Sequence, residues 1–314
     1  MSHSSKSSLF IAALLFAVTV ASADEGEKKR PTKNVPDQVV AYKTVEKSDG
    51  SSDELDLNIF HPPGYQVTGR RPCIVFFFGG GWNGGSPSQF YPHCQYFASR
   101  GMVAISAEYR TKQSHNVAPK SCVADGKSAV RWVRANAAKI GVDPDRIAVG
   151  GGSAGGHVAA AVAACQELEE TPHTPETSCL PNALVLFNPV YDNGPEGYGH
   201  DRVKDYWKIF SPKHNLHKEM PPTIAFFGTE DKLIPVATTK AFASGMAELG
   251  VRYDNHLYEG QGHGFFNYGR SKGDTDYFVE TVRAADLFLN SIGILEGEPN
   301  VEEFVKTQAT NRKR

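Results

Sequence analysis

The sequence lacks the features that mark several classes of protein. Its formal net charge is only −2, with 33 Lys and Arg against 35 Asp and Glu, so no excess of positive charge favours nucleic acid or an anionic membrane as a partner. It has no C-x-x-C pair, which argues against a zinc knuckle or a redox motif. Internal repeats and low-complexity tracts are also missing. What remains is a globular protein whose 314 residues suffice for one large domain with a substantial core.

Cysteine is scarce, and its number is odd. The five residues are Cys73, Cys94, Cys122, Cys165 and Cys179. Cys73 begins an apolar run, so we expect it to be a buried free thiol. Cys165 and Cys179 flank a polar stretch and are the best candidates for a disulfide in an exported protein, with Cys94 and Cys122 as a further candidate pair.

The longest apolar run lies at the N-terminus and is too short for a comfortable membrane span. Lys6 precedes the run Leu9–Val18, and Ala21-Ser22-Ala23 resembles a signal-peptidase site. We therefore expect residues 1–23 to be a cleavable signal peptide, although an uncleaved anchor is the alternative. Cleavage after Ala23 would give a secreted or periplasmic protein with no stable membrane insertion, led by a disordered segment over residues 24–38.

After residue 38, patterns typical of strands alternate with patterns typical of helices. Val39–Glu46 and Leu55–Phe60 alternate as antiparallel strands do, whereas Cys73–Phe78 is continuously apolar, as is typical of a strand buried on both faces. Ser121–Lys139 has the apolar spacing of an amphipathic helix. This order predicts an α/β fold over residues 39–293, in which helices cover both faces of a mostly parallel central sheet.

Two segments depart from this alternation. Residues 191–222 mix Gly, Pro and aromatic residues without a period, which predicts a small lid-like insertion over the strand ends. Residues 294–314 are rich in charge, and we expect them to form a loosely attached C-terminal tail.

Gly151-Gly152-Ser153-Ala154-Gly155 follows the G-x-S-x-G pattern of a nucleophile elbow. It lies between a short apolar strand pattern and an Ala-rich helix pattern, which is the context that this motif requires. Glycine on both sides of the serine removes side chains that a sharp turn would crowd. Ser153 would also stand at a helix N-terminus, where N–H groups favour a developing oxyanion. The alternative is a glycine-rich turn without chemistry.

A serine nucleophile needs a base, and the base needs an orienting carboxylate. His263 lies in Gly262-His263-Gly264, after the last predicted strand, where glycines suit a loop that delivers an imidazole. The preceding predicted strand is followed by Glu230-Asp231. We select Asp231 as the carboxylate, with Glu230 as the alternative. The chain order Ser153, Asp231, His263 is that of α/β-hydrolases.

An oxyanion hole requires backbone N–H groups aimed at one point. The N–H of Ala154 follows the nucleophile, and Gly79-Gly80-Gly81 after the Cys73–Phe78 strand can supply the others. His214 and His217 form an H-x-x-H pair without a third ligand. We therefore predict no metal and no organic cofactor.

The motifs of this sequence resemble those of the hormone-sensitive-lipase-like esterases and their relatives, which include acetyl-xylan esterases, feruloyl esterases and secreted acetylesterases of carbohydrate breakdown. The resemblance spans roughly residues 39–292. It is carried by Phe78-Gly79-Gly80-Gly81-Trp82, Glu108-Tyr109-Arg110, Gly151–His157, Asp231 and Gly262-His263-Gly264. It implies an α/β-hydrolase fold, with Gly80, Gly81 and Ala154 as the oxyanion donors.

The sequence departs from the family in two ways. Phe78 stands where the family motif has a histidine that supports the oxyanion loop, which bears on loop support and substrate preference. A long N-terminal cap is also missing, which favours an open site and short acyl groups. We expect His157, Tyr109 and Arg110 to be structural. Candidate substrate contacts are the aromatic residues Trp82 and Trp207, with Tyr198 and Tyr206 beside the latter in the insertion.

These observations predict a secreted serine carboxylesterase that hydrolyses short-chain esters, of which acetyl groups on plant or algal polysaccharides are the favoured case. Two alternatives remain open. A prolyl-oligopeptidase-like peptidase shares the triad order, but that family usually carries a large propeller domain that this sequence does not contain. The second alternative is a catalytically silent binding protein, and an intact Ser-His-Asp set argues against it.

Overall fold

The structure is a computed structural model that describes Met1 and residues 35–47, 49–169, 177–270 and 276–311. The predicted signal peptide, its cleavage site and most of the predicted lead lie outside these residues. Within the described ranges, none of the helices combines the length and the apolarity that a transmembrane span requires.

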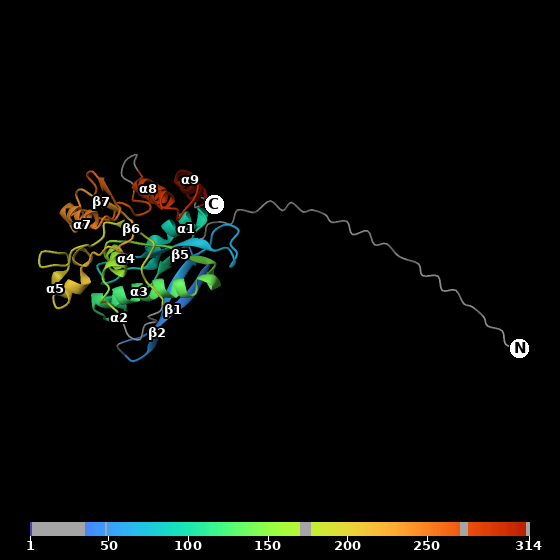
Figure 1. The fold of residues 1–314 in the computed structure, drawn as a ribbon, viewed down its shortest axis with the longest axis horizontal. Coiled ribbons are helices and arrows are strands. Elements are labelled where there is room, and N and C mark those ends of the chain that lie inside the picture. Colours follow the sequence, from blue (N-terminus) through green and yellow to red (C-terminus); the bar gives the residue numbers. More distant parts are fainter. Residues whose placement is uncertain (2–34, 48, 170–176, 271–275, 312–314) are drawn as a thin grey trace. The chain divides into compact units, whose positions relative to one another are not determined.

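Eight strands form one sheet in the order β1-β2-β4-β3-β5-β6-β7-β8. Figure 1 labels β1, β2, β5, β6 and β7 of this sheet. β1 pairs antiparallel with β2, and β2 pairs antiparallel with β4, whereas every later pairing is parallel. The strands are β1 (Gln38–Glu46), β2 (Ser52–Phe60), β3 (Arg71–Phe77), β4 (Val103–Ala107), β5 (Val142–Gly152), β6 (Ala183–Phe187), β7 (Thr223–Gly228) and β8 (Tyr253–Tyr258). The predicted mostly parallel α/β-hydrolase sheet is confirmed.

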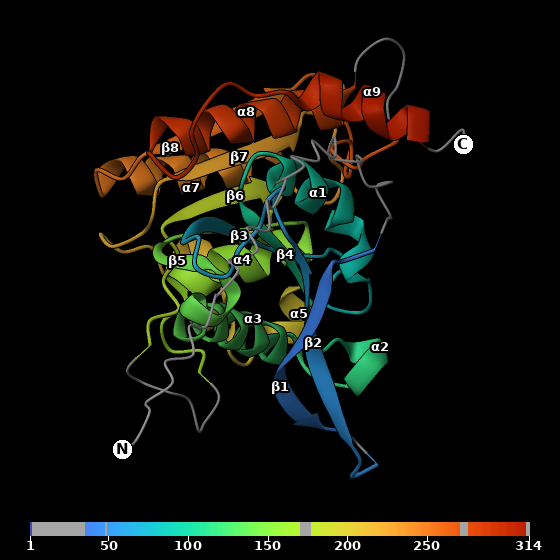
Figure 2. The same ribbon diagram turned by 90° about the vertical axis from the view of Figure 1, so that its right-hand side faces the viewer.

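Helices cover both faces of the sheet (Figure 2). Side chains of β3 alternate between two apolar cores: Val75 and Phe77 enter the core beneath one set of helices, and Ile74 and Phe76 enter the core beneath the other. Because both faces are covered, the strand has no polar side and reads as a continuous apolar run. The first core contains α3 (Pro119–Ala135), α4 (Ala154–Ala164) and α7 (Val236–Glu248), and the second contains α1 (Tyr91–Ser99), α8 (Tyr277–Ser291) and α9 (Val301–Asn311).

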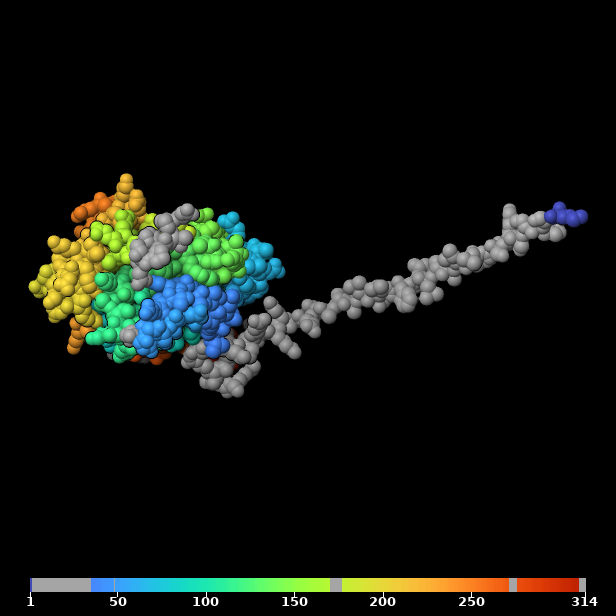
Figure 3. All heavy atoms as spheres, turned by 90° about the horizontal axis from the view of Figure 1, so that it is seen from below, coloured from blue at the N-terminus to red at the C-terminus, as the bar shows by residue number. Residues whose placement is uncertain are grey.

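The insertion over residues 191–222 carries two short helices, α5 (His200–Val203) and α6 (Trp207–Phe210). It occupies one end of the domain surface (Figure 3). Tyr191, at its start, stacks on Phe242 with ring centroids 3.8 Å apart. Aromatic packing of this kind fixes the base of the insertion against the main core. A third short helix, α2 (Lys112–His115), follows β4.

The prediction of a loosely attached tail over residues 294–314 is wrong for its described part. Ile294, Leu295 and Val301 are buried, and the guanidinium of Arg100 donates hydrogen bonds to the carbonyls of Glu296 (2.9 Å) and Gly297 (2.7 Å). The charged composition hid an amphipathic spacing. Its apolar positions lie three and four residues apart, at Val301, Phe304 and Val305, which pack on the second core.

The expected disulfides are not formed, because all five cysteines are free thiols. Cys94 belongs to one core and Cys122 to the core on the opposite face of the sheet. The thiol of Cys165 donates to the carbonyl of Phe210 (3.3 Å), and that of Cys179 to the carbonyl of Val162 (3.9 Å). Burial raises the pKa of each of these thiols above its ordinary value.

His93 is a buried histidine that should make the fold sensitive to acid. Its imidazole lies among the rings of Phe90, Phe187 and Phe278, and neither ring nitrogen has a hydrogen-bond partner in the described chain. Burial lowers the pKa of His93 from 6.5 to about 3. The unfolded chain therefore binds this proton more tightly than the folded chain, so stability present above pH 6.5 is lost as the pH falls towards 3.

The unfolding free energy of the unmodified protein should decrease between pH 7.5 and pH 5. In His93→Leu we expect this decrease to be smaller by about 2 kcal/mol. The measurement is urea unfolding of both proteins across that range, in which the slope of stability against pH is compared. An identical slope in the variant would contradict the assignment, whatever the change in stability at neutral pH.

Candidate active site

Ser153 occupies a sharp turn between β5 and α4, at φ 55° and ψ −121°. The neighbouring backbones are so close that a Cβ on Gly155 would lie 2.1 Å from the carbonyl oxygen of Phe77. One on Gly151 would lie 2.5 Å from the carbonyl oxygen of Gly155. These contacts explain why the motif has glycine on both sides of the serine.

The structure brings Ser153, His263 and Asp231 into one chain of hydrogen bonds. The Ser153 hydroxyl lies 2.8 Å from Nε2 of His263, and Nδ1 of His263 lies 2.7 Å from Oδ2 of Asp231. A carboxylate can only accept hydrogen bonds, so Nδ1 of His263 carries the proton. Nε2 then accepts a hydrogen bond from the serine hydroxyl. Glu230, the alternative carboxylate, is exposed, and its backbone N–H donates to Gln261. The contact with the imidazole therefore belongs to Asp231.

Asp231 is held as a carboxylate by its surroundings. Its second oxygen, Oδ1, accepts hydrogen bonds from the N–H groups of Leu233 (2.8 Å) and Ile234 (3.0 Å). Burial alone would raise the pKa of Asp231, but the hydrogen bond with His263 and those from Ile234 and Leu233 outweigh it, and the pKa lies below its usual value. An ionised partner fixes the ring orientation and the tautomer that a general base needs.

The loop after β3 has the backbone that an oxyanion hole requires. Gly80 and Gly81 have φ angles of 130° and 63°, and a Cβ on Gly80 would meet the carbonyl oxygen of Gly84 at 2.1 Å. The N–H groups of Gly80, Gly81 and Ala154 make no hydrogen bond to protein atoms within the described ranges. All three are thus available to an oxygen bound near Ser153.

Phe78 supports this loop by packing. Its ring stacks on that of Tyr109, with centroids 4.1 Å apart and planes 14° from parallel, and the Tyr109 hydroxyl donates to the Phe78 carbonyl at 2.6 Å. A Cβ on Gly85 would lie 2.5 Å from the Phe78 ring. The aromatic stack therefore fills the place beneath the loop where the family motif has a histidine.

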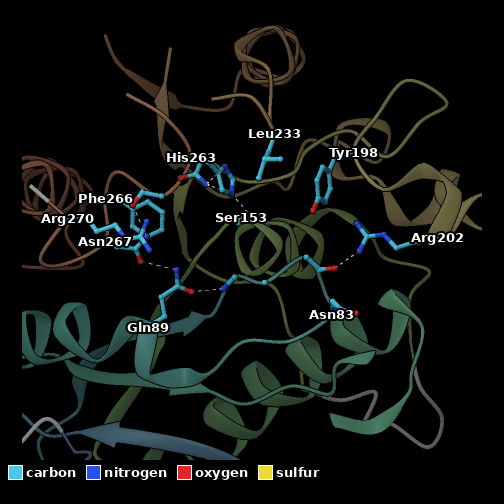
Figure 4. Close-up of a pocket in the computed structure, with 15 residues that line it drawn as sticks. Asn83, Gln89, Ser153, Tyr198, Arg202, Leu233, His263, Phe266, Asn267 and Arg270 are labelled. Carbon is cyan, nitrogen blue, oxygen red and sulfur yellow. Dashed lines mark hydrogen bonds between the residues drawn. The ribbon is translucent and has the colours of Figure 1, made fainter. Parts of the chain in front are cut away.

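A chain of side-chain amides joins the oxyanion loop to the histidine loop (Figure 4). The N–H of Gly79 donates to Oε1 of Gln89 (2.7 Å), and Nε2 of Gln89 donates to Oδ1 of Asn267 (3.0 Å). Nδ2 of Asn267 then donates to the carbonyl of Gly264, beside His263 (2.8 Å). The two loops are thereby held in a fixed relation.

The serine opens into a pocket of about 500 Å³. Figure 4 shows Ser153 in the middle of this pocket, with Tyr198 and Arg202 on one side and Phe266, Asn267 and Arg270 on the other. The walls are mainly glycines, amides and guanidinium groups, and Leu233 and Phe266 add apolar surface. The pocket thus offers both hydrogen-bond donors and apolar contacts to a ligand at Ser153.

Neither tryptophan that we expected to contact substrate lines this pocket, and both predictions are wrong. Trp82 is almost fully buried, with its ring 5.0 Å from that of His157 and 5.6 Å from that of Phe210. The ring of Trp207 lies edge-on to His214 at 5.0 Å. Each tryptophan packs between elements of the scaffold, a placement that tertiary structure decides and local sequence does not.

The residues expected to be structural do hold the scaffold. Nε2 of His157 lies 3.0 Å from the carbonyl oxygen of Phe210, and Arg110 forms a buried bidentate pair with Asp125.

Within the described ranges, no group of three His, Cys, Asp or Glu side chains has the geometry of a metal site.

Sequence reasoning missed several pocket residues, of which Asn188 is the nearest to the imidazole. Its amide nitrogen lies 3.1 Å from Nδ1 and 3.2 Å from Nε2 of His263. Asn188 directly follows β6, so the rule that functional groups gather at the carboxyl ends of parallel strands would have found it. The other missed residues are Asn83, Gln89, Arg202, Leu233, Phe266, Asn267 and Arg270.

An elbow serine after a buried parallel strand, met by a histidine from a loop beyond the last strand, is the arrangement of α/β-hydrolases. Comparisons with known proteins agree. The BD-FAE family model matches residues 57–185, and the dienelactone hydrolase family model matches residues 198–290.

The apo structure of esterase 2 from Thermogutta terrifontis is 43% identical, covers 86% of this chain and 100% of its own, and superposes with a TM-score of 0.78. The same enzyme with bound propionate is 44% identical, with 83% and 96% covered and a TM-score of 0.77. The chain therefore belongs to the α/β-hydrolase family of carboxylic ester hydrolases.

Curated relatives are longer than this chain. Esterase LipQ of Mycobacterium tuberculosis is 28% identical over 62% of this chain, and esterase LipC of the same organism is 30% identical over 72%. The matched region makes up 50% and 59% of those two proteins, so the chain spans little more than half the length of these curated relatives.

Proposed function

We propose that this protein is a serine carboxylesterase of short-chain esters. One observation carries the proposal: the hydrogen-bonded series Ser153, His263, Asp231 lies at a pocket whose wall also presents the free N–H groups of Gly80 and Gly81. Nucleophile, base and electrostatic stabiliser thus surround one space large enough for an ester.

In this mechanism the Ser153 hydroxyl attacks the ester carbonyl while Nε2 of His263 takes its proton. Asp231 holds the imidazole and stabilises the cation that forms. The N–H groups of Gly80, Gly81 and Ala154 bind the oxyanion of the tetrahedral intermediate. His263 returns the proton to the leaving alcohol, and water then releases the acid from the acyl-enzyme by the same steps.

The test uses p-nitrophenyl acetate together with paraoxon, which phosphorylates the Thermogutta enzyme. Paraoxon should release one p-nitrophenolate per chain, stop acetate hydrolysis and leave a diethylphosphoryl group on the peptide that contains Ser153. The same assay decides between the alternatives. A silent binding protein would turn over no ester, and a peptidase would favour peptide amides over the acetate.

Short acyl chains are the expected preference. Amides, guanidinium groups and glycines are the most numerous lining residues, and Leu233 and Phe266 are the apolar ones. A long acyl chain would therefore also meet polar groups, and each added CH₂ would gain less than the usual ~0.8 kcal/mol. Structures of the Thermogutta esterase with bound propionate and butyrate support this. Phe78 and Trp82 lie outside the pocket, so the expected preference rests on the polar groups of the lining.

We expect kcat/KM on p-nitrophenyl esters to peak between acetate and butyrate and to fall more than tenfold at octanoate. The measurement is a series of initial rates below KM at fixed detergent concentration. A maximum at octanoate or beyond would contradict the proposal and indicate a lipid ester.

The favoured natural substrates are acetyl groups carried by plant or algal polysaccharides, and the protein would be secreted or periplasmic. Amide and guanidinium donors in the pocket suit sugar hydroxyls, and the signal-like N-terminus suits a substrate outside the cell. Release of acetate from acetylated xylan tests the substrate.

Export is tested at the N-terminus of the mature protein. Because Ala21-Ser22-Ala23 fits a signal-peptidase site, Edman sequencing of the exported protein should begin at Asp24. Membrane-bound material that begins at Met1 would contradict cleavage and support an uncleaved anchor.

A further inference from the structure

The active-site pocket is lined by two guanidinium groups, and the nearby carboxylate of Asp231 is already engaged by His263. Its described lining contains the guanidinium groups of Arg202 and Arg270 and no Asp or Glu side chain. Whole-chain composition does not explain this excess, since the formal net charge is −2. The two arginines lie on opposite sides of Ser153 (Figure 4). A substrate at the serine is thus flanked by cations.

Arg202 is held in place by uncharged groups. It donates to the carbonyl of Gly81 at 2.6 Å, and its guanidinium carbon lies 4.9 Å from the ring centre of Trp82 and 5.3 Å from that of Tyr198. Five N–H donors are available to a guanidinium, so most remain for a ligand. Asp201 and Asp205 are exposed neighbours in sequence, and neither forms an ion pair with Arg202 in the described chain.

Arg270 stands at the other end of the pocket, where it is exposed and forms no ion pair with the described residues. Its backbone N–H donates to the carbonyl of Asn267 at 3.2 Å, which ties it to the amide chain that joins the two catalytic loops. The position of this cation is thus coupled to the loop that carries His263.

Several other arginines of the described chain are paired with carboxylates. Arg100 pairs with Asp286, Arg131 with Glu169 and Arg252 with Asp254, at 2.6 to 2.7 Å. A second, smaller cavity of about 170 Å³ adjoins the pocket at Tyr198 and Leu233 and contains Asp192 and Glu196. Asp192 already binds Lys213 at 2.8 Å, and neither acid belongs to the pocket lining. Arg202 and Arg270 thus form no such ion pair with the residues that the structure describes.

We propose that the pocket selects esters that also carry a carboxylate, which Arg202 and Arg270 bind. Guanidinium groups bind carboxylates through paired hydrogen bonds, and a cleft lined by one sign of charge raises the local concentration of ligands of the opposite sign. An acetylated acidic sugar is one such substrate. The inference rests on the proposed esterase function and adds the charge of the substrate to it.

The test compares esters that differ only in charge. 4-Acetoxybenzoate and 4-acetoxybenzamide place the charge on the alcohol, whereas monoethyl adipate and its monoamide place it on the acyl group. We expect kcat/KM to favour the charged member of at least one pair by about fivefold or more at low salt. The pair that shows the preference identifies the side of the ester that carries the carboxylate.

Three further results should accompany that preference. Arg270→Gln should reduce the charged-to-neutral ratio of kcat/KM at least threefold, with the larger loss on the charged ester. Arg202→Gln should also lower the ratio, with some loss on both esters because it releases the Gly81 carbonyl. In 1 M NaCl the preference should shrink, since the screening length falls from about 10 Å at 0.1 M salt to about 3 Å.

The control is Arg70→Gln, which removes the same charge at the N-terminal end of β3, the opposite end of the strand from the pocket. Its ratio should match that of the unmodified protein. Equal rates on both members of both pairs, or a ratio that neither pocket variant changes, would overturn the inference. Absence of turnover on every ester, charged and neutral alike, would instead overturn the proposed esterase function.

Discussion

Replacing Ser153 with alanine should lower kcat on every accepted ester by at least about three orders of magnitude, because the change removes the attacking oxygen. The hydroxyl lies 2.8 Å from the His263 base, and the described pocket contains no second hydroxyl in contact with that imidazole. Residual hydrolysis would come from water activated by His263 beside the oxyanion donors. Stopped assays on p-nitrophenyl acetate over hours measure the residual rate.

The fold should survive this substitution, since alanine keeps the Cβ and the backbone hydrogen bond from Ser153 to Phe187 (2.9 Å). Circular dichroism and thermal unfolding check this. Ser88→Ala removes the hydroxyl of an exposed serine outside the pocket and serves as the control. Activity of Ser153→Ala within tenfold of the unmodified protein would exclude Ser153 as the nucleophile.

Asp231→Asn should cost roughly 10³ to 10⁴ in kcat. An amide can no longer act as a pure acceptor towards Nδ1 of His263, so the imidazole loses both its preferred tautomer and the negative charge that stabilises its protonated form. Asparagine has nearly the same shape as aspartate, so the substitution changes the charge and the hydrogen bonding of the side chain and leaves its packing unchanged. The backbone N–H groups of Leu233 and Ile234 still find an amide oxygen, so the stability of the loop should change little.

Glu230→Gln is the matched comparison, because it makes the same chemical change one residue earlier. Glu230 is exposed, and we expect its variant to retain activity within about threefold. Steady-state kinetics of the two variants, measured at one pH near neutrality, give the ranking. The reverse ranking would assign the orienting role to Glu230 and would require the loop after β7 to rearrange in solution.

Sequence reasoning was strongest where local rules decide the structure. The elbow around Ser153 could be predicted because crowding at a strand-to-helix turn dictates its glycines. Asp231 and His263 could be selected because each follows the carboxyl end of a parallel strand. The same rule extended to Asn188 would have added the amide beside the imidazole.

The errors arose where distant segments meet. Whether Trp82 faces the pocket or the core depends on packing against Phe210 and His157, which no local pattern encodes. Cys94 and Cys122 lie on opposite faces of the sheet, although their sequence spacing gave no sign of this. The final helix was hidden because its charged and uncharged polar residues together outnumber the few apolar ones, such as Val301, that attach it to the core.

The backbone angles of Ser153 have an evolutionary consequence. A residue with a side chain at φ 55° and ψ −121° carries a strain of about 1 to 3 kcal/mol, whereas glycine adopts such angles readily. Mutation to glycine at this position would therefore favour the folded state while abolishing the nucleophile. Selection for thermal stability alone would enrich inactive descendants of this chain, so only selection for turnover keeps a serine here.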